Sequence, residues 1–218
     1  MGSVLGDLLP LAVGVAISPI PIVAAILMLL SRNAGGTSTG FGIGWVAGIL
    51  VTTAVVMLLA GNIDTSDREP APAVSWIKIG LGVLLLVVAL RQWRARTSTE
   101  VPGWMQAIDQ LSVPKALGLG AVLAAVNPKN LLLCVSAGVT IGTAGQSAAG
   151  EVTALLVFTL LAAATVLIPV IGYRLAADRL RGSLDALKVW LQANNHMVMA
   201  IVLLIMGAVV IGKGLGGL

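Results

Sequence analysis

Six long apolar runs separated by short polar stretches dominate the chain. The runs cover about 4–30, 41–60, 76–90, 113–143, 152–173 and 196–213. A helix rises about 1.5 Å per residue, so each run can cross a hydrocarbon layer about 30 Å thick, the short third run only with the help of Gln92 and Trp93. None of them shows the two-residue alternation of a membrane β-strand. The pattern predicts an all-α membrane protein with six transmembrane helices in a single domain, 1–218.

Composition agrees with a lipid environment. Hydrophobic residues make up 58% of the chain and charged residues only 10%, whereas a soluble domain has roughly 45–50% and about 25%. The single cysteine, Cys134, excludes an intramolecular disulfide, a CxxC redox pair and a cysteine metal cluster. No HExxH, GxSxG or P-loop motif is present, and no paired carboxylates lie within a run. We therefore expect a protein that is not an enzyme and needs neither cofactor nor metal.

The basic residues indicate topology and not nucleic-acid binding, although the formal net charge is +4. With six spans, the loops that follow the odd-numbered spans share one side of the membrane. That side carries Arg32, Arg91, Arg94, Arg96, Lys115, Arg174, Arg179, Arg181 and Lys188. The opposite side has Arg68, Lys78 and Lys213. We expect the first side to be cytoplasmic, both termini to lie outside a plasma (inner) membrane, and the first run to remain as a span, since no signal-peptide pattern begins it.

The stretch 174–195 lies between the fifth and sixth runs and repeats its leucines at helical spacing among charged residues. This pattern predicts an amphipathic helix on the membrane surface.

An internal repeat links the first and fourth runs. AVGVAISPIPIVAAIL resembles AVLAAVNPKNLLLCV, with Ser18-Pro19 above Asn127-Pro128 at an offset of about 109 residues. A duplicated unit of three helices must insert upside down, because three is odd, which predicts an inverted repeat of the kind found in secondary transporters. Repeat one would cover about 4–91, the connector 92–112, and repeat two about 113–213. A random match of apolar residues is the alternative.

Prolines interrupt both repeated runs near their middles. Pro19 and Pro21 lie in the first run and Pro128 in the fourth. A proline inside a helix removes a hydrogen bond and clashes with the preceding turn, at a cost of about 3 kcal/mol. We expect two broken helices that serve as hinges, with breaks that face each other and form a polar centre in an apolar bundle.

Four polar residues beside these prolines are the candidate substrate-binding residues: Lys129, Asn127, Asn130 and Ser18. A lysine in the middle of a span costs about 2.5–3.5 kcal/mol, so Lys129 should face a cavity or a partner, where it could bind an anionic group. The alternative for Lys129 is a side chain that extends to the membrane interface. For the other three residues it is simple repair of the helix ends.

Other features carry weaker hypotheses. His196 is an interfacial residue or a proton relay, and Asp7 and Glu151 are solvated end residues or coupling groups. The small residues Gly40, Gly42, Gly44 and Gly48 predict close helix packing and leave a homodimer open.

The two proline breaks and the segment LKVWLQANNHMVMAIVLLIMGAVVIGKGLGGL at 187–218 resemble the LysE superfamily of six-helix exporters, and within it the Sap/GAP branch of actinobacteria, the peptidoglycolipid- and sulfolipid-addressing proteins. The resemblance implies export of an amino-acid-like or amphipathic solute, or movement of envelope glycolipids, with membrane lipids as partners. Some members of the superfamily carry electrons through a cysteine in each broken helix. This chain has Ser18 and Asn127 near those places, which argues against electron transfer.

The leading hypothesis is a secondary-type transporter with alternating access that hinges at Pro19, Pro21 and Pro128 and binds the anionic part of a lipid-like cargo at Lys129. Three alternatives stay open: a non-transporting scaffold that recruits lipid-synthesis or export machinery through its basic loops, an exporter of amino-acid-like solutes, and a channel.

Overall fold

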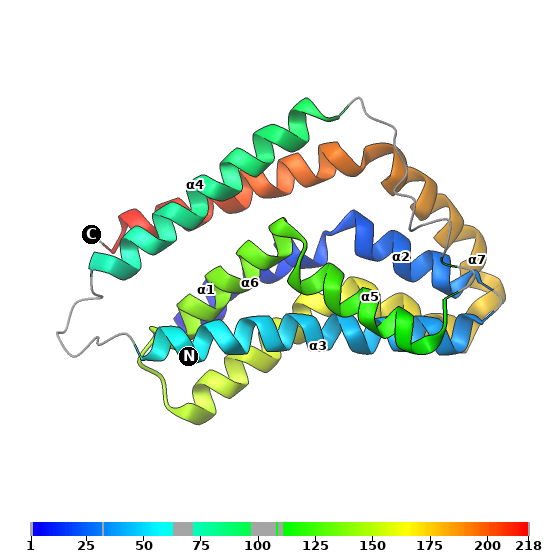
Figure 1. The fold of residues 1–218 in the computed structure, drawn as a ribbon, viewed down its shortest axis with the longest axis horizontal. Helices are drawn as coiled ribbons and strands as arrows, with labels where there is room; N and C mark the ends of the chain where they lie inside the picture. The colour runs from blue at the N-terminus through cyan, green and yellow to red at the C-terminus, as the bar shows by residue number, and fades with distance from the viewer. Residues whose placement is uncertain (1, 32, 63–71, 97–107, 109–110, 218) are drawn as a thin grey trace.

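The computed structural model describes residues 2–31, 33–62, 72–96, 108 and 111–217, with the side chains of 72–73 and 174–178 left out. The described residues form the helices α1 (Gly2–Ala16), α2 (Pro19–Leu29), α3 (Ala34–Gly61), α4 (Pro72–Arg94), α5 (Val113–Ala125), α6 (Pro128–Gly142) and α7 (Ala148–Leu215) (Figure 1). No strand occurs among them. The predicted all-α class is confirmed for this part of the chain.

Four helical segments are long and apolar enough to cross a membrane by themselves: Ala34–Gly61, Val74–Arg94, Ala148–Tyr173 and Arg179–Leu215. The pair α1 and α2 and the pair α5 and α6 also qualify, each as a span that bends by 55° and 66° respectively. The chain therefore has four to six candidate spans and is a multi-pass membrane protein. The predicted breaks of the first and fourth runs are present, at Pro19 and Pro128.

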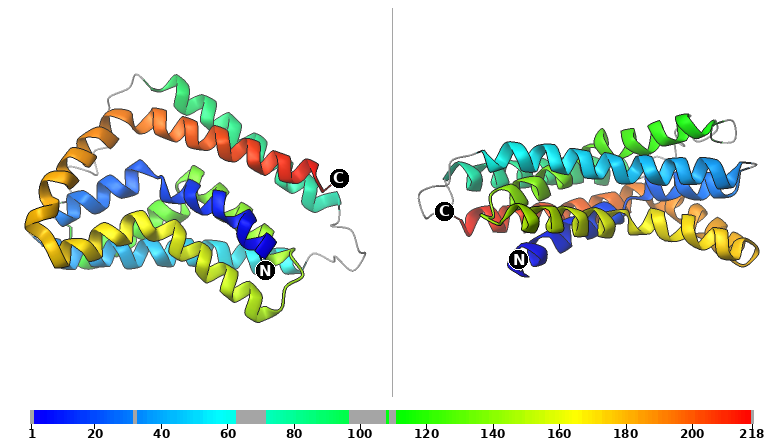
Figure 2. Two further views of the ribbon diagram at one scale, coloured as in Figure 1. Left: turned by 180° about the vertical axis from the view of Figure 1, so that it is seen from behind. Right: turned by 90° about the horizontal axis from the view of Figure 1, so that it is seen from below.

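Helix α7 has 68 residues and contains the fifth run, the predicted amphipathic segment and the sixth run. It turns back on itself, and its last part lies beside α4 (Figures 1 and 2). In the turning region Leu184 and Leu191 belong to one buried cluster with Ile26 of α2. The segment is thus helical, as predicted, but it is continuous with both neighbouring runs, and its described leucines Leu184 and Leu191 pack on α2.

Glycines allow the helices of each packed pair to approach closely. A Cβ atom at Gly120 of α5 would lie 2.8 Å from the backbone nitrogen of Trp45 in α3, and one at Gly44 would overlap the backbone of Leu117. Gly82 of α4 and Gly207 of α7 face each other in the same way. A Cβ atom at Gly82 would lie 2.9 Å from the Gly207 carbonyl oxygen, and one at Gly207 would lie 3.0 Å from the Gly82 carbonyl oxygen. The packing role of the glycine stripe in α3 is thus confirmed at Gly44, while the homodimer remains a prediction.

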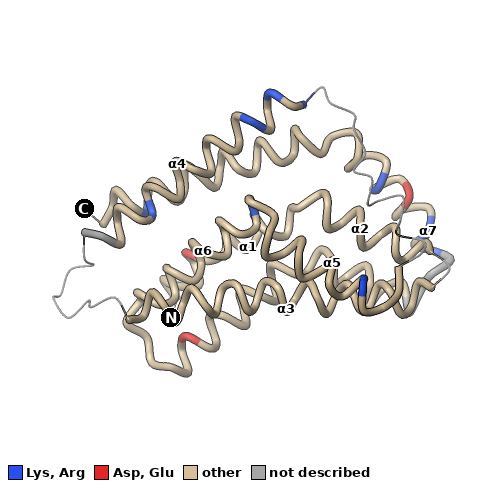
Figure 3. The backbone as a smooth tube through the Cα atoms, viewed as in Figure 1, with Lys and Arg blue, Asp and Glu red and all other residues tan. Residues whose placement is uncertain are grey.

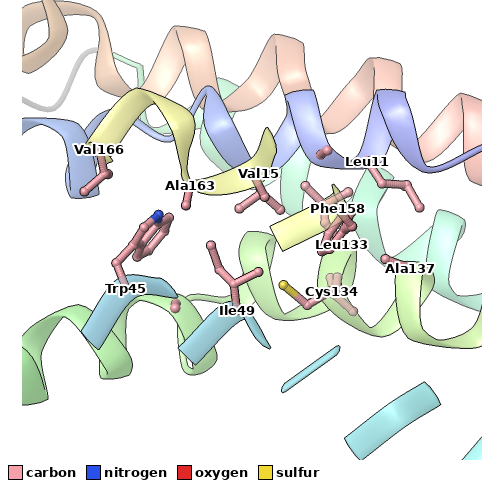
Figure 4. Packing of buried hydrophobic residues seen from close by; sticks show 14 of the residues in the cluster. Leu11, Val15, Trp45, Ile49, Leu133, Cys134, Ala137, Phe158, Ala163 and Val166 are labelled. Atoms are coloured by element: carbon pink, nitrogen blue, oxygen red, sulfur yellow. The ribbon is translucent and has the colours of Figure 1, made fainter. Parts of the chain in front are cut away.

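The core lies where α1, α3, α6 and the first part of α7 meet (Figure 4). It contains Leu11, Val15, Trp45, Ile49, Leu133, Cys134, Ala137, Phe158, Ala163 and Val166, all nearly or fully buried. Large apolar side chains also cover the outside of the bundle, where Ile168 is 68% and Leu59 67% exposed. This surface is suited to lipid and not to water.

Most charges lie toward the two ends of the bundle, with long uncharged stretches between them (Figure 3). On α4, Lys78 is in the second turn, and Arg91 and Arg94 are in the last turn. On α7, Lys213 is in the last turn, beside the start of α1. Lys78 and Lys213 therefore share the end of the bundle where α1 begins.

The close approach of α3 and α5 predicts that Gly120→Val destabilises the protein by about 3 kcal/mol or more, because the added methyl groups would meet backbone atoms that cannot move aside. Thermal unfolding in detergent micelles measures this. Gly118→Val on the same helix is the matched control, since a Cβ atom there meets nothing within 4 Å. Equal stability of the two variants would contradict the packing assignment.

Candidate functional site

The two helix breaks meet inside the bundle. Lys129 Nζ in α6 donates a hydrogen bond of 2.7 Å to the carbonyl oxygen of Ile17, the residue after α1 ends. Ser18 Oγ lies 2.8 Å from Asn130 Oδ1. Each contact joins residues 112 positions apart. Lys129, Asn130 and Ser18, three of the four candidate residues, therefore form one connected group.

The prolines of the first break explain which carbonyl groups need partners. In an unbroken helix the N–H groups of residues 19 and 21 would donate to the carbonyls of Val15 and Ile17, but proline has no N–H. Ser18 Oγ lies 2.6 Å from the Val15 oxygen, and Lys129 Nζ donates to the Ile17 oxygen. Ser18 carries one hydroxyl proton, so at any moment it donates either to Val15 or to Asn130. The side chains at the break thus replace the hydrogen bonds that the prolines removed.

A third donor at this break comes from α7. Thr165 Oγ1 donates a hydrogen bond of 2.6 Å to the carbonyl oxygen of Ala16. Sequence reasoning missed this residue, because a threonine within an apolar run usually bonds the carbonyl of its own helix four residues back. Three successive carbonyls, from Val15 to Ile17, therefore accept hydrogen bonds from side chains at three different places in the chain, and the Ala16 oxygen also accepts from the Ser18 backbone N–H.

The second break is repaired mostly by its own residues. Asn127 is the N-cap of α6, with φ −61° and ψ 118°, and its side chain accepts from the Lys129 backbone N–H at 3.1 Å. Asn130 Nδ2 donates to the Leu123 oxygen at 3.3 Å. Both asparagines thus repair helix ends, and Asn130 also reaches the first break.

Lys129 is fully buried, with 0% of its surface exposed. This excludes the alternative in which the side chain extends to the membrane interface. An ammonium group has three donors, and the described contacts of Lys129 Nζ use one of them. The ion pairs within the described part of the chain are Lys188–Asp185 and Lys213–Asp7, so no described carboxylate faces Lys129. Among the described residues, the amine of Lys129 therefore has no counter-charge and has donors beyond the one given to Ile17.

A groove of about 300 Å³ reaches the second break from one side. Its lining is mainly apolar, with two amide side chains, and consists of Ile20, Gln92, Val122, Leu123, Val126, Asn127, Pro128 and Met199. At its margin Gln92 Oε1 lies 2.7 Å from His196 Nδ1, which connects α4 to α7. The groove touches Asn127 but not Lys129, so the amine is closed off from it.

Metal chemistry has no support in the described residues, where no group of three or more His, Cys, Asp or Glu side chains could hold an ion. The arrangement is suited to binding a hydrogen-bond acceptor. It offers amine and amide N–H donors in an apolar interior, where charge-assisted hydrogen bonds are strong.

The contact between the breaks predicts that Ser18 and Asn130 are energetically coupled. A double-mutant cycle with Ser18→Ala and Asn130→Ala should give a coupling energy of about 0.6–1.7 kcal/mol in the free energy of unfolding in mixed micelles. Ser136→Ala is the matched control, because Ser136 Oγ is equally buried but bonds the Leu132 oxygen of its own helix. A cycle of Asn130→Ala with Ser136→Ala should give no coupling. Coupling of the same size in both cycles would refute a specific link.

Comparison with known proteins gives one match. The sequence profile of a family described as "Sap, sulfolipid-1-addressing protein" matches residues 8–216, which includes both breaks and all four candidate residues. No curated protein and no solved structure matches the chain. Because the match extends over nearly the whole length, the chain belongs to the Sap, sulfolipid-1-addressing protein, family.

Proposed function

We propose that this protein is a secondary-type transporter of the plasma membrane that moves, or helps to move, an anionic amphipathic lipid of the cell envelope outward. The observation that carries the proposal is the buried side-chain amine of Lys129, which joins two broken helices and has no described anionic partner. The family name supports a role in the export or addressing of lipid.

A positive charge on Lys129 is costly in the apolar interior. A charged lysine in the centre of a span costs about 2.5–3.5 kcal/mol, and one carbonyl contact offsets only part of that cost. An anionic head group, such as a sulfo, phosphate or carboxylate group, would accept the remaining donors and neutralise the charge. The lysine would then select for anionic cargo. Asn127 and Asn130 would add neutral hydrogen bonds once their helix ends rearrange.

The proposed architecture is six spans in two inverted repeats, as in the LysE superfamily. Two features support it. Bent pairs occur at corresponding places in the two halves, with bends of 55° and 66°. The reciprocal glycines Gly82 and Gly207 lie in α4 and the last part of α7, which would be the third helix of each repeat. Pro19, Pro21 and Pro128 would then be hinge residues, and the end of α4 with Arg91 and Arg94 would face the cytoplasm.

Alternating access would work through the hydrogen bonds at the break. The carbonyls of Val15 and Ile17 are held by Ser18 and Lys129, and not by a continuous helix. If the bound head group draws Lys129 Nζ away from Ile17, the Ile17 carbonyl loses its partner and the angle between α1 and α2 can change. Cargo binding and hinge motion would thereby be coupled through one shared ammonium group.

We expect Lys129→Met to reduce lipid transfer about tenfold or more, since a charge-assisted hydrogen bond contributes about 1.5–3 kcal/mol. Methionine keeps the apolar volume of the side chain, so the protein should still fold. The measurement is movement of a fluorescent sulfated glycolipid between the leaflets of proteoliposomes that contain the purified protein. Asn127→Ala should have a smaller effect, because it removes a neutral bond.

Lys115→Met is the control for this experiment, because Lys115 is an exposed lysine on α5. Unchanged transfer by Lys129→Met would remove the site assignment. Wild-type protein that moves no lipid would refute transport and favour the scaffold, and single-channel current would favour a channel.

A further inference from the structure

An ion pair joins α1 to the last turn of α7 on the side of the breaks where α1 begins and α7 ends, here called the terminal side. Lys213 Nζ lies 3.0 Å from Asp7 Oδ1 and also donates a hydrogen bond of 2.6 Å to the carbonyl oxygen of Asp7. One ammonium group thus binds both the carboxylate and the main chain of α1. The contact connects residues 206 positions apart.

The position of this ion pair matches the boundary of a membrane. Asp7 precedes Ile17 by about ten residues, or about 15 Å of helix, which is half of a hydrocarbon layer about 30 Å thick. With the break near the middle of the bilayer, the ion pair lies where the hydrocarbon ends. Its exposure agrees, since the side chain of Asp7 is 51% exposed and that of Lys213 is 23% exposed. Lys78 of α4 interacts electrostatically with both.

Between the ion pair and the break, the terminal side is closed by apolar packing. A Cβ atom at Gly14 of α1 would lie 2.9 Å from Leu133 Cδ1 and 3.0 Å from Met206 Cγ. Met206 and Leu133 are 6% and 0% exposed. Helix α1 therefore contacts α6 and α7 so closely that even a methyl group would be crowded.

The opposite side of the breaks differs. There the groove of about 300 Å³ opens to Asn127 and Pro128, and Gln92, near the far end of α4 from Lys78, contributes to its lining. The groove thus reaches the second break at Asn127 from one side, while Lys129 is closed off from it and the terminal side is packed shut. A cycle of alternating access needs the terminal side to stay closed while the groove side opens.

We propose that the Asp7–Lys213 ion pair is a gate that holds α1 against α7 and keeps the terminal side closed in this state. An ion pair at a hydrated boundary suits this role, because water can replace its contacts at little cost and the pair can break and re-form. The packing of Gly14 against Met206 would separate when the pair opens. The gate serves the proposed transport function, but its opening can be measured without any cargo.

The test uses Met206→Cys as a reporter in a Cys134→Ala background, labelled with a membrane-impermeant maleimide in sealed vesicles of each orientation. Asp7→Asn and Lys213→Gln should each raise the labelling rate from the terminal side up to about fivefold, the shift that about 1 kcal/mol of lost coupling produces. The charge-exchanged protein, Asp7→Lys with Lys213→Asp, should restore protection. Val210→Cys, also buried on α7, is a second reporter if the first does not fold.

The matched control is the ion pair Lys188–Asp185, whose side chains are 22% and 51% exposed but which lies within α7. Asp185→Asn should leave the labelling rate unchanged. Unaltered labelling in both Asp7→Asn and Lys213→Gln would overturn the gate whatever the transport result. Normal lipid transfer by Lys129→Met would refute the cargo site and leave the gate standing, so the two failures are distinguishable.

Discussion

The structure depends on one constraint: backbone carbonyl groups in an apolar interior must have hydrogen-bond donors. Pro19 and Pro21 remove the donors of two carbonyls, and no water of the bilayer core can replace them. The chain satisfies the Val15 and Ile17 oxygens with Ser18 and Lys129, and the Ala16 oxygen with Thr165. Side chains therefore donate to the carbonyls that the prolines leave without their helical partners, and two of these side chains come from distant parts of the sequence.

This repair ties the fold to the function that we propose. Lys129 is stable in the interior only while some acceptor takes its donors, and at present that acceptor is a carbonyl of the opposite break. The same ammonium group is the natural partner for an anion. A residue that completes the backbone in one state, and is drawn from it toward cargo in another, links the two events energetically.

Around this centre, close packing of the helix backbones holds the helices together more than polar contacts do. Gly44 and Gly120 bring α3 against α5, and Gly82 and Gly207 bring α4 against α7. The outside of the bundle is as apolar as its core, so lipid gives no strong drive for helix association, and close van der Waals packing has to supply it. Polar contacts across helices are few in the described residues, and those at the breaks and at Asp7–Lys213 lie where motion would matter.

The sequence by itself determined the apolar runs, the all-α class and the two breaks, because hydrophobicity and the missing proline N–H are local properties that tertiary context cannot remove. It also marked Ser18, Asn127, Lys129 and Asn130 as unusual, since polar residues beside such prolines have a cost in lipid. Only the tertiary structure decided that Lys129 faces Ile17 and that Thr165 donates a hydrogen bond to the Ala16 oxygen at the break. It also decided that 174–195 belongs to α7, that its leucines Leu184 and Leu191 pack on α2, and that Asp7 pairs with Lys213. These are contacts between distant segments, and they depend on how α1, α6 and α7 cross in space, which no local pattern of residues records.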